Sequence, residues 1–219
     1  MSSLALMRWL ESTPDRYDAG MRLLTLGRVT RLHDAIADAA AEKPGDRVLE
    51  IGCGTGAVTA RLAARGAAVT ALDQNPEMME RARHRLETAA EPCTSVEWIE
   101  RTASEIDALP AEHFDGVVAS LCLSEMSRDE RAFVLREARL RLRPGGRLVV
   151  GDEVRPHRAL LRVVHAALRA PQAIAAWLIA GSLSRPIPDL EGEMRAAGFE
   201  IERGEHFLLG GLALVVGRR

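Results

Sequence analysis

The sequence predicts an α/β fold, in which helices cover both faces of a doubly wound, mixed sheet of seven strands. Between residues 47 and 151, short apolar runs alternate with helical segments of about 10 to 15 residues, which is typical of parallel strands joined by helices. After residue 197, the runs FEIERGEHF and LALVVGRR leave room only for a turn between them. They predict a hairpin, so one strand of the sheet must run antiparallel.

The individual elements follow from local signals along the chain. Apolar runs predict strands over residues 47–51, 68–72, 96–100, 116–120 and 147–151, followed by the two strands of the hairpin. Helical patterns, start signals and stop signals predict helices over residues 4–10, 21–41, 57–65, 76–90, 128–142 and 189–197. Gly66 closes one of these helices, and Pro76 stands at the first position of the next.

The chain length favours a single domain. With 219 residues and 47% hydrophobic content, the chain can bury one large core, and residues 1–219 are predicted to form one unit. Within it, residues 1–45 are helical, 46–155 carry the alternating strands and helices, 156–186 form a helical insert, and 187–219 form the final helix and hairpin.

Charge and composition exclude several function classes. A formal net charge of −2 and a pI near 6.3 provide no basic field for nucleic acid, so the expected partner is a small molecule. Three scattered cysteines, Cys53, Cys93 and Cys122, form neither a disulfide framework nor a metal signature. No secretory signal is evident, and the most apolar run, AIAAWLIA, is shorter than the ~18 residues of a membrane span. A cytoplasmic protein is expected.

Three glycines at alternate positions follow the first strand of the alternating region. In VLEIGCGTGA, Gly52, Gly54 and Ala57 satisfy the permissive dinucleotide pattern G-x-G-x-x-G/A, and Asp73 follows at a distance suited to holding a ribose. Gly56 is not required by this pattern and counts against a dinucleotide. The glycines lie at the carboxyl end of a strand, where doubly wound sheets bind their ligands. This stretch alone fits a dinucleotide such as NAD or another nucleoside.

Taken together, several segments resemble the class I S-adenosylmethionine-dependent methyltransferases, which have a Rossmann-like fold. The segments are VLEIGCGTG, VTALDQNPEMM, FDGVVASLCLSEM and LRPGGRLVVGDE. The resemblance implies that the glycine turn holds the methionine part of S-adenosylmethionine and that Asp73 takes both ribose hydroxyls. The cofactor contacts implied are Tyr17, Glu50, Gly52, Cys53, Gly54, Gly56, Asp73, Gln74, Met78, Ala103, Ser104 and Ser120.

Two departures from the family pattern limit what is carried over. Where the family often has an acidic residue and an alanine after the third strand, this chain has Thr102-Ala103-Ser104. The fourth strand ends in SLCLSE, without the Asn/Asp-Pro-Pro-aromatic run of enzymes that methylate a base or amide nitrogen. The first departure affects the adenine contacts, and the second argues against such nitrogen acceptors.

Methyl transfer depends mainly on alignment of acceptor, methyl and sulfur. A general base is needed only where the acceptor atom carries a proton. Glu125, Asp152 and His157 are expected near the site at strand ends. Glu125 and Asp152 are the candidates for this base, and His157 is a third. The alternative for Glu125 is a helix cap or a loop charge, and for Asp152 a structural or substrate-shaping role is favoured.

Two flanking segments have alternative interpretations. Residues 1–45 resemble an N-terminal lid, in which Tyr17 and Arg22 would cover the cofactor; the other interpretation is an ordinary surface tyrosine and helix charge. In and before the insert, basic residues at steps of three or four form a helical stripe made of Arg155, Arg158, Arg162, His165 and Arg169. The insert has three alternative interpretations. It forms a lid over an apolar substrate, or a surface that contacts a membrane or an acidic partner, or a pair of helices whose arginine face is in solvent.

The acceptor remains open at the level of sequence. The segments RYDAGMRLLTLGRV, LCLSEMS and GDEVRP resemble corrinoid protein-associated methyltransferases, and the overall pattern is also similar to quinone-type carbon methyltransferases. The alternatives are an NAD(P)-dependent oxidoreductase and a non-catalytic S-adenosylmethionine-binding accessory protein. The single tyrosine, Tyr17, and the single lysine, Lys43, lie too far apart to form a Tyr-x-x-x-Lys pair, which counts against one large oxidoreductase branch.

Overall fold

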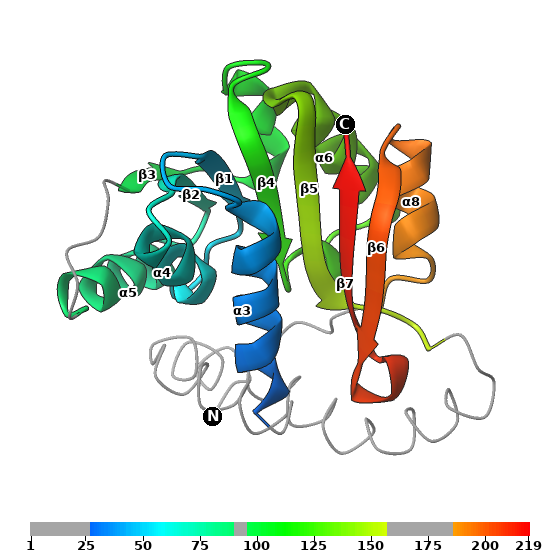
Figure 1. The fold of residues 1–219 in the computed structure, drawn as a ribbon, viewed down its shortest axis with the longest axis horizontal. Coiled ribbons are helices and arrows are strands. Elements are labelled where there is room, and N and C mark those ends of the chain that lie inside the picture. Colours follow the sequence, from blue (N-terminus) through cyan, green and yellow to red (C-terminus); the bar gives the residue numbers. More distant parts are fainter. Residues whose placement is uncertain (1–26, 90–95, 157–185) are drawn as a thin grey trace, which may run out of the picture.

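A computed structural model describes residues 27–89, 96–156 and 186–219, which build a seven-stranded sheet with helices on both faces (Figure 1). The strand order is β3-β2-β1-β4-β5-β7-β6. The strands are β1 (Arg47–Ile51), β2 (Ala68–Asp73), β3 (Val96–Glu100), β4 (Phe114–Ser120), β5 (Leu142–Glu153), β6 (Glu200–Phe207) and β7 (Leu212–Arg218). The first five are mutually parallel, and β7 runs antiparallel to both β5 and β6. The predicted fold class is confirmed.

Five helices and three short 3₁₀ helices are described. The helices are α3 (Arg28–Ala40), α4 (Ala57–Ala64), α5 (Pro76–Glu87), α6 (Arg128–Arg141) and α8 (Leu190–Ala196). The 3₁₀ helices, which the sequence patterns did not predict, are η1 (Ala103–Ala108), η2 (Leu123–Glu125) and η3 (Leu208–Gly210). Most predicted boundaries hold within a few residues, but β5 begins at Leu142, directly after α6, instead of at Arg147. The helix predicted over residues 21–41 is described as Arg28–Ala40, because Gly27 has the left-handed backbone of its N-cap.

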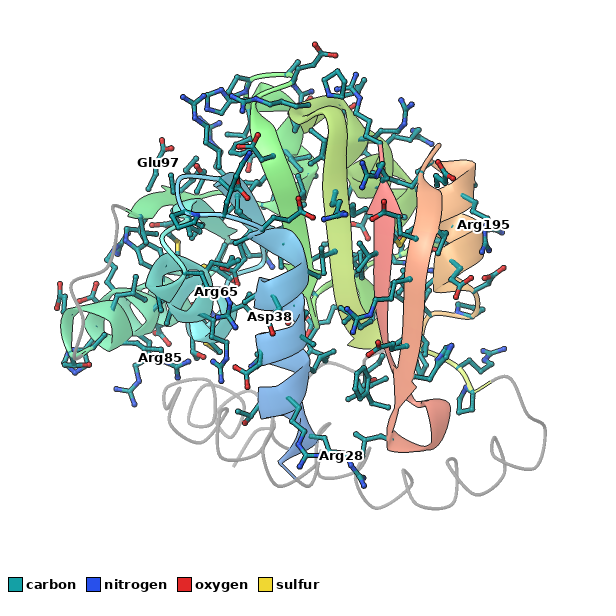
Figure 2. All side chains as sticks on the ribbon, in the orientation of Figure 1. Arg28, Asp38, Arg65, Arg85, Glu97 and Arg195 are labelled. Atoms are coloured by element: carbon teal, nitrogen blue, oxygen red, sulfur yellow. The ribbon has the colours of Figure 1, made fainter. Side chains whose placement is uncertain are left out.

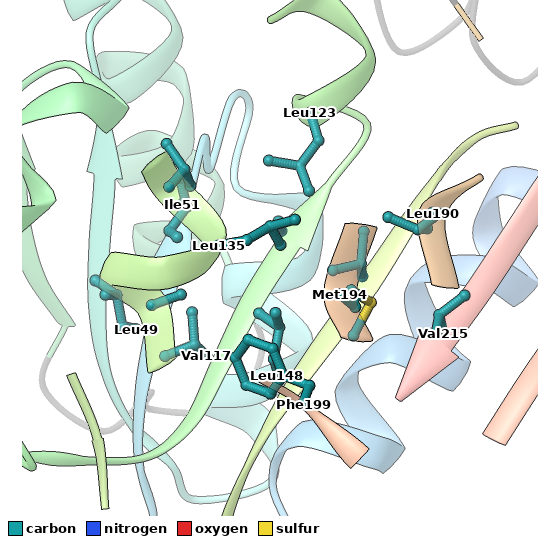
Figure 3. Packing of buried hydrophobic residues seen from close by; sticks show 14 of the residues in the cluster. Leu49, Ile51, Val117, Leu123, Leu135, Leu148, Leu190, Met194, Phe199 and Val215 are labelled. Atoms are coloured by element: carbon teal, nitrogen blue, oxygen red, sulfur yellow. The ribbon is translucent and has the colours of Figure 1, made fainter. Parts of the chain in front are cut away.

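Alternation along each strand divides the core into two layers. In β1, Leu49 and Ile51 join the cluster on the α6 and α8 face, whereas Val48 joins the cluster under α3 and α4. Figure 3 shows the first cluster, in which Leu135 of α6 and Met194 of α8 pack against the sheet. Successive side chains of a strand therefore pack on opposite faces of the sheet, and helices cover both faces, as expected for a doubly wound sheet.

Helix α3 lies close against the sheet because two strand positions are glycines. A Cβ at Gly116 of β4 would lie 2.7 Å from the Ala40 carbonyl oxygen, and one at Gly151 of β5 would lie 2.4 Å from Ile36 Cδ1. Ion pairs then fix α3 to α4: Arg61 Nε lies 2.5 Å from an Asp34 oxygen, and Arg65 pairs with Asp38 in the same way. Figure 2 shows Asp38 and Arg65 on these neighbouring helices. The middle and the C-terminal part of α3 are thereby held against the sheet and α4.

Several predicted features lie outside the described residues. They are the helices before residue 27, including Tyr17 and Arg22, most of the insert with His157 and the rest of the basic stripe beyond Arg155, and Cys93. In the parts of the chain that are described, no helix combines the length and apolarity needed to cross a membrane. The same parts contain no group of three or more His, Cys, Asp or Glu side chains arranged to hold a metal ion.

Candidate functional site

A cavity of about 620 Å³ opens at the carboxyl ends of β1, β2 and β4. In the strand order, the chain turns from one half of the sheet to the other between β1 and β4, and ligands of doubly wound sheets bind at this switch point. The cavity is lined by Val29, Thr30, His33, Glu50, Gly52, Cys53, Gly54, Thr55, Ala57, Val58, Arg61, Asp73, Gln74, Asn75, Met78, Arg85, Ser120, Leu121, Cys122 and Glu125. Most of the residues predicted for the site therefore meet in one place.

The three glycines at alternate positions are needed for different structural reasons. All have positive φ angles, +69° at Gly52, +51° at Gly54 and +74° at Gly56, which side chains disfavour. A Cβ at Gly52 would lie 2.7 Å from Cys122 Cβ, and one at Gly56 would lie 2.8 Å from Cβ of Ala82 on α5. A Cβ at Gly54 would meet no described protein atom within 4 Å. Gly54 thus faces open space in the cavity, whereas Gly56, which does not line the cavity, allows α4 and α5 to approach.

Asp73, at the end of β2, holds the glycine turn and still has acceptor capacity. Its Oδ2 accepts a hydrogen bond from the Gly54 N–H at 2.7 Å, and its Oδ1 accepts one from the Asn75 N–H at 2.8 Å. A carboxylate has about four lone-pair sites, so each oxygen can accept one more donor. This geometry suits a pair of neighbouring hydroxyl groups.

Glu50 is a buried acid in the wall of the cavity. Its side chain is only 1% exposed, and its Oε2 accepts a hydrogen bond from the Thr59 hydroxyl of α4 at 2.6 Å. Burial raises the pKa of the Glu50 carboxyl to about 8; the Thr59 hydrogen bond lowers this pKa and the charge of Asp73 raises it. At neutral pH the free carboxyl group is therefore mostly protonated.

The start of α5 forms another part of the wall. Gln74 and Met78 line the cavity as predicted, and Asn75, which the sequence analysis did not select, lies between them. The Asn75 side chain caps α5 by accepting hydrogen bonds from the Glu77 N–H at 2.9 Å and the Met78 N–H at 3.2 Å. The Asn-Pro pair at 75–76 was the available signal, because asparagine is favoured at an N-cap and proline at the next position.

The turn after β4 places Ser120, Leu121 and Cys122 against the cavity. Leu121 has a φ of +54°, an unusual conformation for a leucine, and its N–H donates to the Gly151 carbonyl at 2.8 Å. The Cys122 thiol donates to the Ile51 carbonyl at 3.2 Å. Burial raises the pKa values of both Cys53 and Cys122, so these thiols stay neutral and pack as small apolar groups.

Glu125, at the end of η2, lines the cavity and is not a helix cap. The cap of α6 is Ser127, whose hydroxyl accepts a hydrogen bond from the Glu130 N–H at 3.3 Å. The Glu125 side chain reaches solvent but stands within the cavity. Partial burial there raises the pKa of its carboxyl, and the charges of Asp152 and Asp73 raise it further. A carboxyl group with a raised pKa suits proton exchange with a bound molecule.

Asp152 lies beneath the η2 turn and does not line the cavity. Fully buried, it accepts hydrogen bonds from the Leu123 N–H at 2.8 Å and the Ser124 N–H at 3.3 Å. Burial raises the pKa of Asp152 to about 6, whereas its hydrogen bonds lower it. On the other side of the turn, Arg131 donates to the Met126 carbonyl at 2.8 Å. Asp152 was also a candidate base, but these contacts, and its absence from the cavity lining, favour a structural role for it.

Two predicted adenine contacts lie outside the cavity, and several helix residues that were not predicted lie in its wall. Ala103 packs against the core cluster and Ser104 hydrogen-bonds Thr102 within the η1 cap at 2.6 Å, so neither lines the cavity; their adenine contacts stay a prediction. Sequence reasoning missed the residues contributed by helix faces, namely Val29, Thr30 and His33 of α3, Arg61 of α4 and Arg85 of α5. Helical periodicity shows which face is polar, but it does not tell which helix end lies over the cavity.

Comparisons with known proteins agree with this architecture. A model of the family described as Methyltransferase domain matches residues 48–146. The ubiquinone/menaquinone biosynthesis C-methyltransferase UbiE of Vibrio campbellii is 32% identical over 207 residues, which cover 86% of this chain and 78% of that protein. The demethylmenaquinone methyltransferase of Tropheryma whipplei is 37% identical over 114 residues, or 52% of this chain, and the match spans only 44% of that relative's length.

A solved structure supports the fold independently. The 1,6-didemethyltoxoflavin-N1-methyltransferase of Burkholderia thailandensis, with bound 1,6-didemethyltoxoflavin and S-adenosylhomocysteine, superposes with a TM-score of 0.63 and 21% identity. The match covers 94% of this chain and 90% of that chain. At this identity the likeness concerns the fold alone. From the sheet topology, the family match and the relative from Vibrio campbellii, this chain belongs to the class I S-adenosylmethionine-dependent methyltransferases.

Proposed function

We propose that this protein transfers the methyl group of S-adenosylmethionine to a small-molecule acceptor. The observation that carries the proposal is the meeting of Gly54 and Asp73 in one cavity, since Gly54 leaves open space and Asp73 has two acceptor positions to spare. The family to which the chain belongs supports the same cofactor.

The residues fit the parts of the cofactor. Asp73 would accept the two ribose hydroxyls, and Gln74 and Met78 would lie beside the ribose and adenine. The glycine turn would take the methionine part, with Glu50 in the wall nearby. When bound, S-adenosylmethionine supplies a methyl group on a positively charged sulfur that is already a good leaving group.

The protein would contribute alignment and proton acceptance. The cavity would hold the acceptor near the cofactor, and such positioning supplies much of the rate enhancement in reactions of this kind. Where the acceptor atom carries a proton, Glu125 is the group in the cavity wall whose raised pKa suits taking it up. Asp152 and Arg131 would keep the η2 turn, and hence Glu125, in place.

The acceptor class we favour is an apolar aromatic ring methylated at carbon, as in quinone biosynthesis. The support is the relative named as a ubiquinone/menaquinone biosynthesis C-methyltransferase. An acceptor connected with corrinoid metabolism is the second candidate, supported by the segments RYDAGMRLLTLGRV, LCLSEMS and GDEVRP. Contact of the insert over residues 156–186 with a membrane surface is part of this proposal, because the insert combines apolar residues with a basic stripe.

The test begins with calorimetric titrations of S-adenosylmethionine, S-adenosylhomocysteine and NADH. We expect the first two to bind and NADH to give no heat; the reverse result would favour an oxidoreductase. Asp73→Ala should weaken S-adenosylmethionine binding by about 100-fold, the equivalent of two hydrogen bonds to a charged group at about 1.5 kcal/mol each. Asp73→Asn keeps one oxygen acceptor and should lose about half of this free energy. Unchanged affinity in Asp73→Ala would remove Asp73 from the cofactor site.

Turnover distinguishes an enzyme from a cofactor-binding accessory protein. Formation of S-adenosylhomocysteine is measured with a demethylated quinol and, separately, with a corrinoid acceptor. Product with the quinol supports the favoured acceptor, and product with the corrinoid alone transfers the proposal to the second candidate. Binding of the cofactor without turnover on either would favour the accessory role.

A further inference from the structure

The η2 turn, which carries Glu125 in the cavity wall, is held from two sides. On one side, two N–H groups of the turn donate hydrogen bonds to the buried carboxylate of Asp152, near the end of β5. On the other side, Arg131 of α6 donates from Nη1 to the carbonyl of Met126, the residue directly after Glu125, at 2.8 Å. The position of the turn therefore depends on side chains from two separate elements.

Arg131 is itself oriented by Glu193 of α8, which lies 62 positions away in the chain. Arg131 Nε donates to Glu193 Oε2 at 2.8 Å and Arg131 Nη2 donates to Glu193 Oε1 at 2.9 Å, so the ion pair is bidentate. The two side chains are only 6% and 17% exposed, and water competes little for either charge. This pairing directs the third nitrogen, Nη1, at the Met126 carbonyl, an arrangement that the single nitrogen of a lysine does not reproduce.

Asp152 and Glu193 belong to the two parts of the chain that flank residues 156–186. These parts are joined to each other, because Val154 and Ile187 form a parallel bridge with backbone hydrogen bonds of 2.9 Å beside it. Asp152 stands just before this bridge, and α8 with Glu193 begins shortly after it. Both flanking parts thus reach the same η2 turn, one directly and the other through α6.

We propose that Arg131 and Glu193 are positioning residues for Glu125, so that α8 contributes to the placement of the catalytic base as well as to the core. The inference rests on the proposed function, in which Glu125 takes up a proton from the acceptor. Glu193 fixes the Arg131 guanidinium, which fixes the Met126 carbonyl, and the turn then holds the Glu125 carboxyl group in the cavity wall. Arg131 and Glu193 do not line the cavity, so they act through the turn and not on a ligand.

The choice of an ion pair at this place is the physical reason for the proposal. A buried ion pair adds little net stability, because desolvation of two charges offsets most of their attraction. Apolar side chains, such as Leu135 on α6 and Met194 on α8, already join the two helices to the core (Figure 3). Apolar groups would not provide a donor for the Met126 carbonyl. The contact that only the arginine supplies is the one that ends at the η2 turn.

The first measurement separates cofactor binding from turnover. Calorimetric titration gives the affinity for S-adenosylhomocysteine, and formation of this product gives kcat and KM with the demethylated quinol or, if that gives no product, with the corrinoid acceptor. In Arg131→Lys, which keeps the charge but not the fork, affinity should stay within about twofold of wild type. Its kcat should fall about 10- to 100-fold, since misplacement of a catalytic group by about 1 Å has an effect of this size. Glu193→Gln keeps one oxygen acceptor and should lose less.

The pH dependence of kcat gives a readout that a packing role would not change. Burial raises the pKa of Glu125, and the charges of Asp152, Asp73 and Glu153 raise it further. If Arg131→Lys releases the turn, water reaches Glu125 more freely and its pKa should fall toward the usual range. The increase of kcat with pH should therefore move to lower pH in Arg131→Lys, whereas a general weakening of the fold would leave its position unchanged.

A double variant separates positioning from stability. Arg131→Met combined with Glu193→Leu leaves no unpaired charge buried, so urea unfolding should give a stability close to wild type. The Met126 carbonyl still loses its donor, so kcat should stay low. The control is an ion pair on the surface of the same helix, in which Glu191 lies 2.8 Å from Arg195 and the side chains are 33% and 57% exposed; Glu191→Ala should keep wild-type kcat.

Hydrogen exchange reports on the turn without any acceptor. The Leu123 and Ser124 N–H groups, which donate to Asp152, should exchange about tenfold faster in Arg131→Lys than in the wild type. The N–H groups of β1 should keep their wild-type rates, because β1 has no contact with this ion pair.

Each result decides a separate question. Wild-type kcat in Arg131→Lys and in the double variant, or unchanged exchange at the turn, overturns the inference and leaves the proposed function intact. A parallel loss of affinity and kcat also overturns it, because that result shows a general effect on the fold. No product from the wild type with either acceptor overturns the proposed function and this inference with it. Because the double variant leaves no unpaired charge, the inference stays testable if a single variant fails to fold.

Discussion

The glycine turn yields a prediction in which stability and binding respond to different positions. Gly54→Ala places a methyl group where no described protein atom lies within 4 Å, so the main cost to folding is the left-handed backbone at φ +51°, about 1–2 kcal/mol. Gly56→Ala has this cost and also places its methyl 2.8 Å from Ala82 Cβ and 3.0 Å from Ala82 Cα. Overpacking adds about 1–3 kcal/mol, for a total of about 2–5 kcal/mol.

Cofactor affinity should follow the opposite order. The Gly54 methyl occupies space that a ligand would use, so S-adenosylhomocysteine should bind about 10- to 100-fold more weakly, the equivalent of about 1–3 kcal/mol of steric overlap. Gly56 does not line the cavity, so the folded fraction of Gly56→Ala should bind nearly as the wild type does. Urea unfolding without ligand gives stability, and calorimetric titration gives affinity. Wild-type affinity in Gly54→Ala, or a Gly56→Ala protein of full stability and impaired binding, would refute the reasoning.

Three further predictions concern single side chains. Burial raises the pKa of Glu50 from 4.5 to about 8, so the unfolded chain releases this proton first, and the free energy of unfolding falls as pH rises from about 4.5 to 8. Glu50→Gln should remove this pH-dependent loss, which is at most on the order of 5 kcal/mol, from urea unfolding curves recorded across that range. A wild type as stable at pH 8 as at pH 5 would contradict the prediction. If Glu125 accepts a proton, kcat should increase with pH through a pKa above the usual glutamate range. Glu125→Gln should lower kcat by about 10²- to 10⁴-fold and make it independent of pH. An unchanged pH dependence of kcat in Glu125→Gln would exclude Glu125 as the base. Gly116→Ala should destabilise the fold by about 1–3 kcal/mol, because the new methyl would lie 2.7 Å from the Ala40 carbonyl of α3; an unfolding midpoint equal to wild type would show that α3 can move away.

Much of the fold was predictable because its signals are local. The strands are short apolar runs that end in turn residues, and the helices between them carry capping signals such as Gly66 after α4. The hairpin at residues 199–219 required an antiparallel strand, because too few residues separate its two runs for a crossover. What local signals did not provide was the length of β5, since Arg143 to Gly146 look like a turn but form an unpaired irregularity within the strand, between the pairs Leu142–Phe114 and Arg147–Gly116.

The candidate site was predictable where a residue's role comes from its place at a strand end. Gly54 and Asp73 follow β1 and end β2, and parallel strands bring such ends to one edge of the sheet. Asp152 illustrates where this reasoning fails. It also stands near a strand end, but its neighbour is the η2 turn, whose N–H groups donate hydrogen bonds to its carboxylate below the cavity. Position along a strand predicts the edge, whereas packing decides which side chains reach the ligand.

The sequence by itself determined the order of the strands and main helices, the mixed sheet and the glycine-aspartate pair that meets in the cavity, because these depend on patterns within one or two neighbouring elements. Only the tertiary structure decided that Gly56 serves the packing of α5, that α3 contributes Thr30 and His33 to the cavity, and that Glu50 is buried with Thr59 as its donor. These features depend on contacts between segments far apart in the chain. The energy of a carboxyl group is set by how deeply the assembled fold buries it and by which groups then surround it.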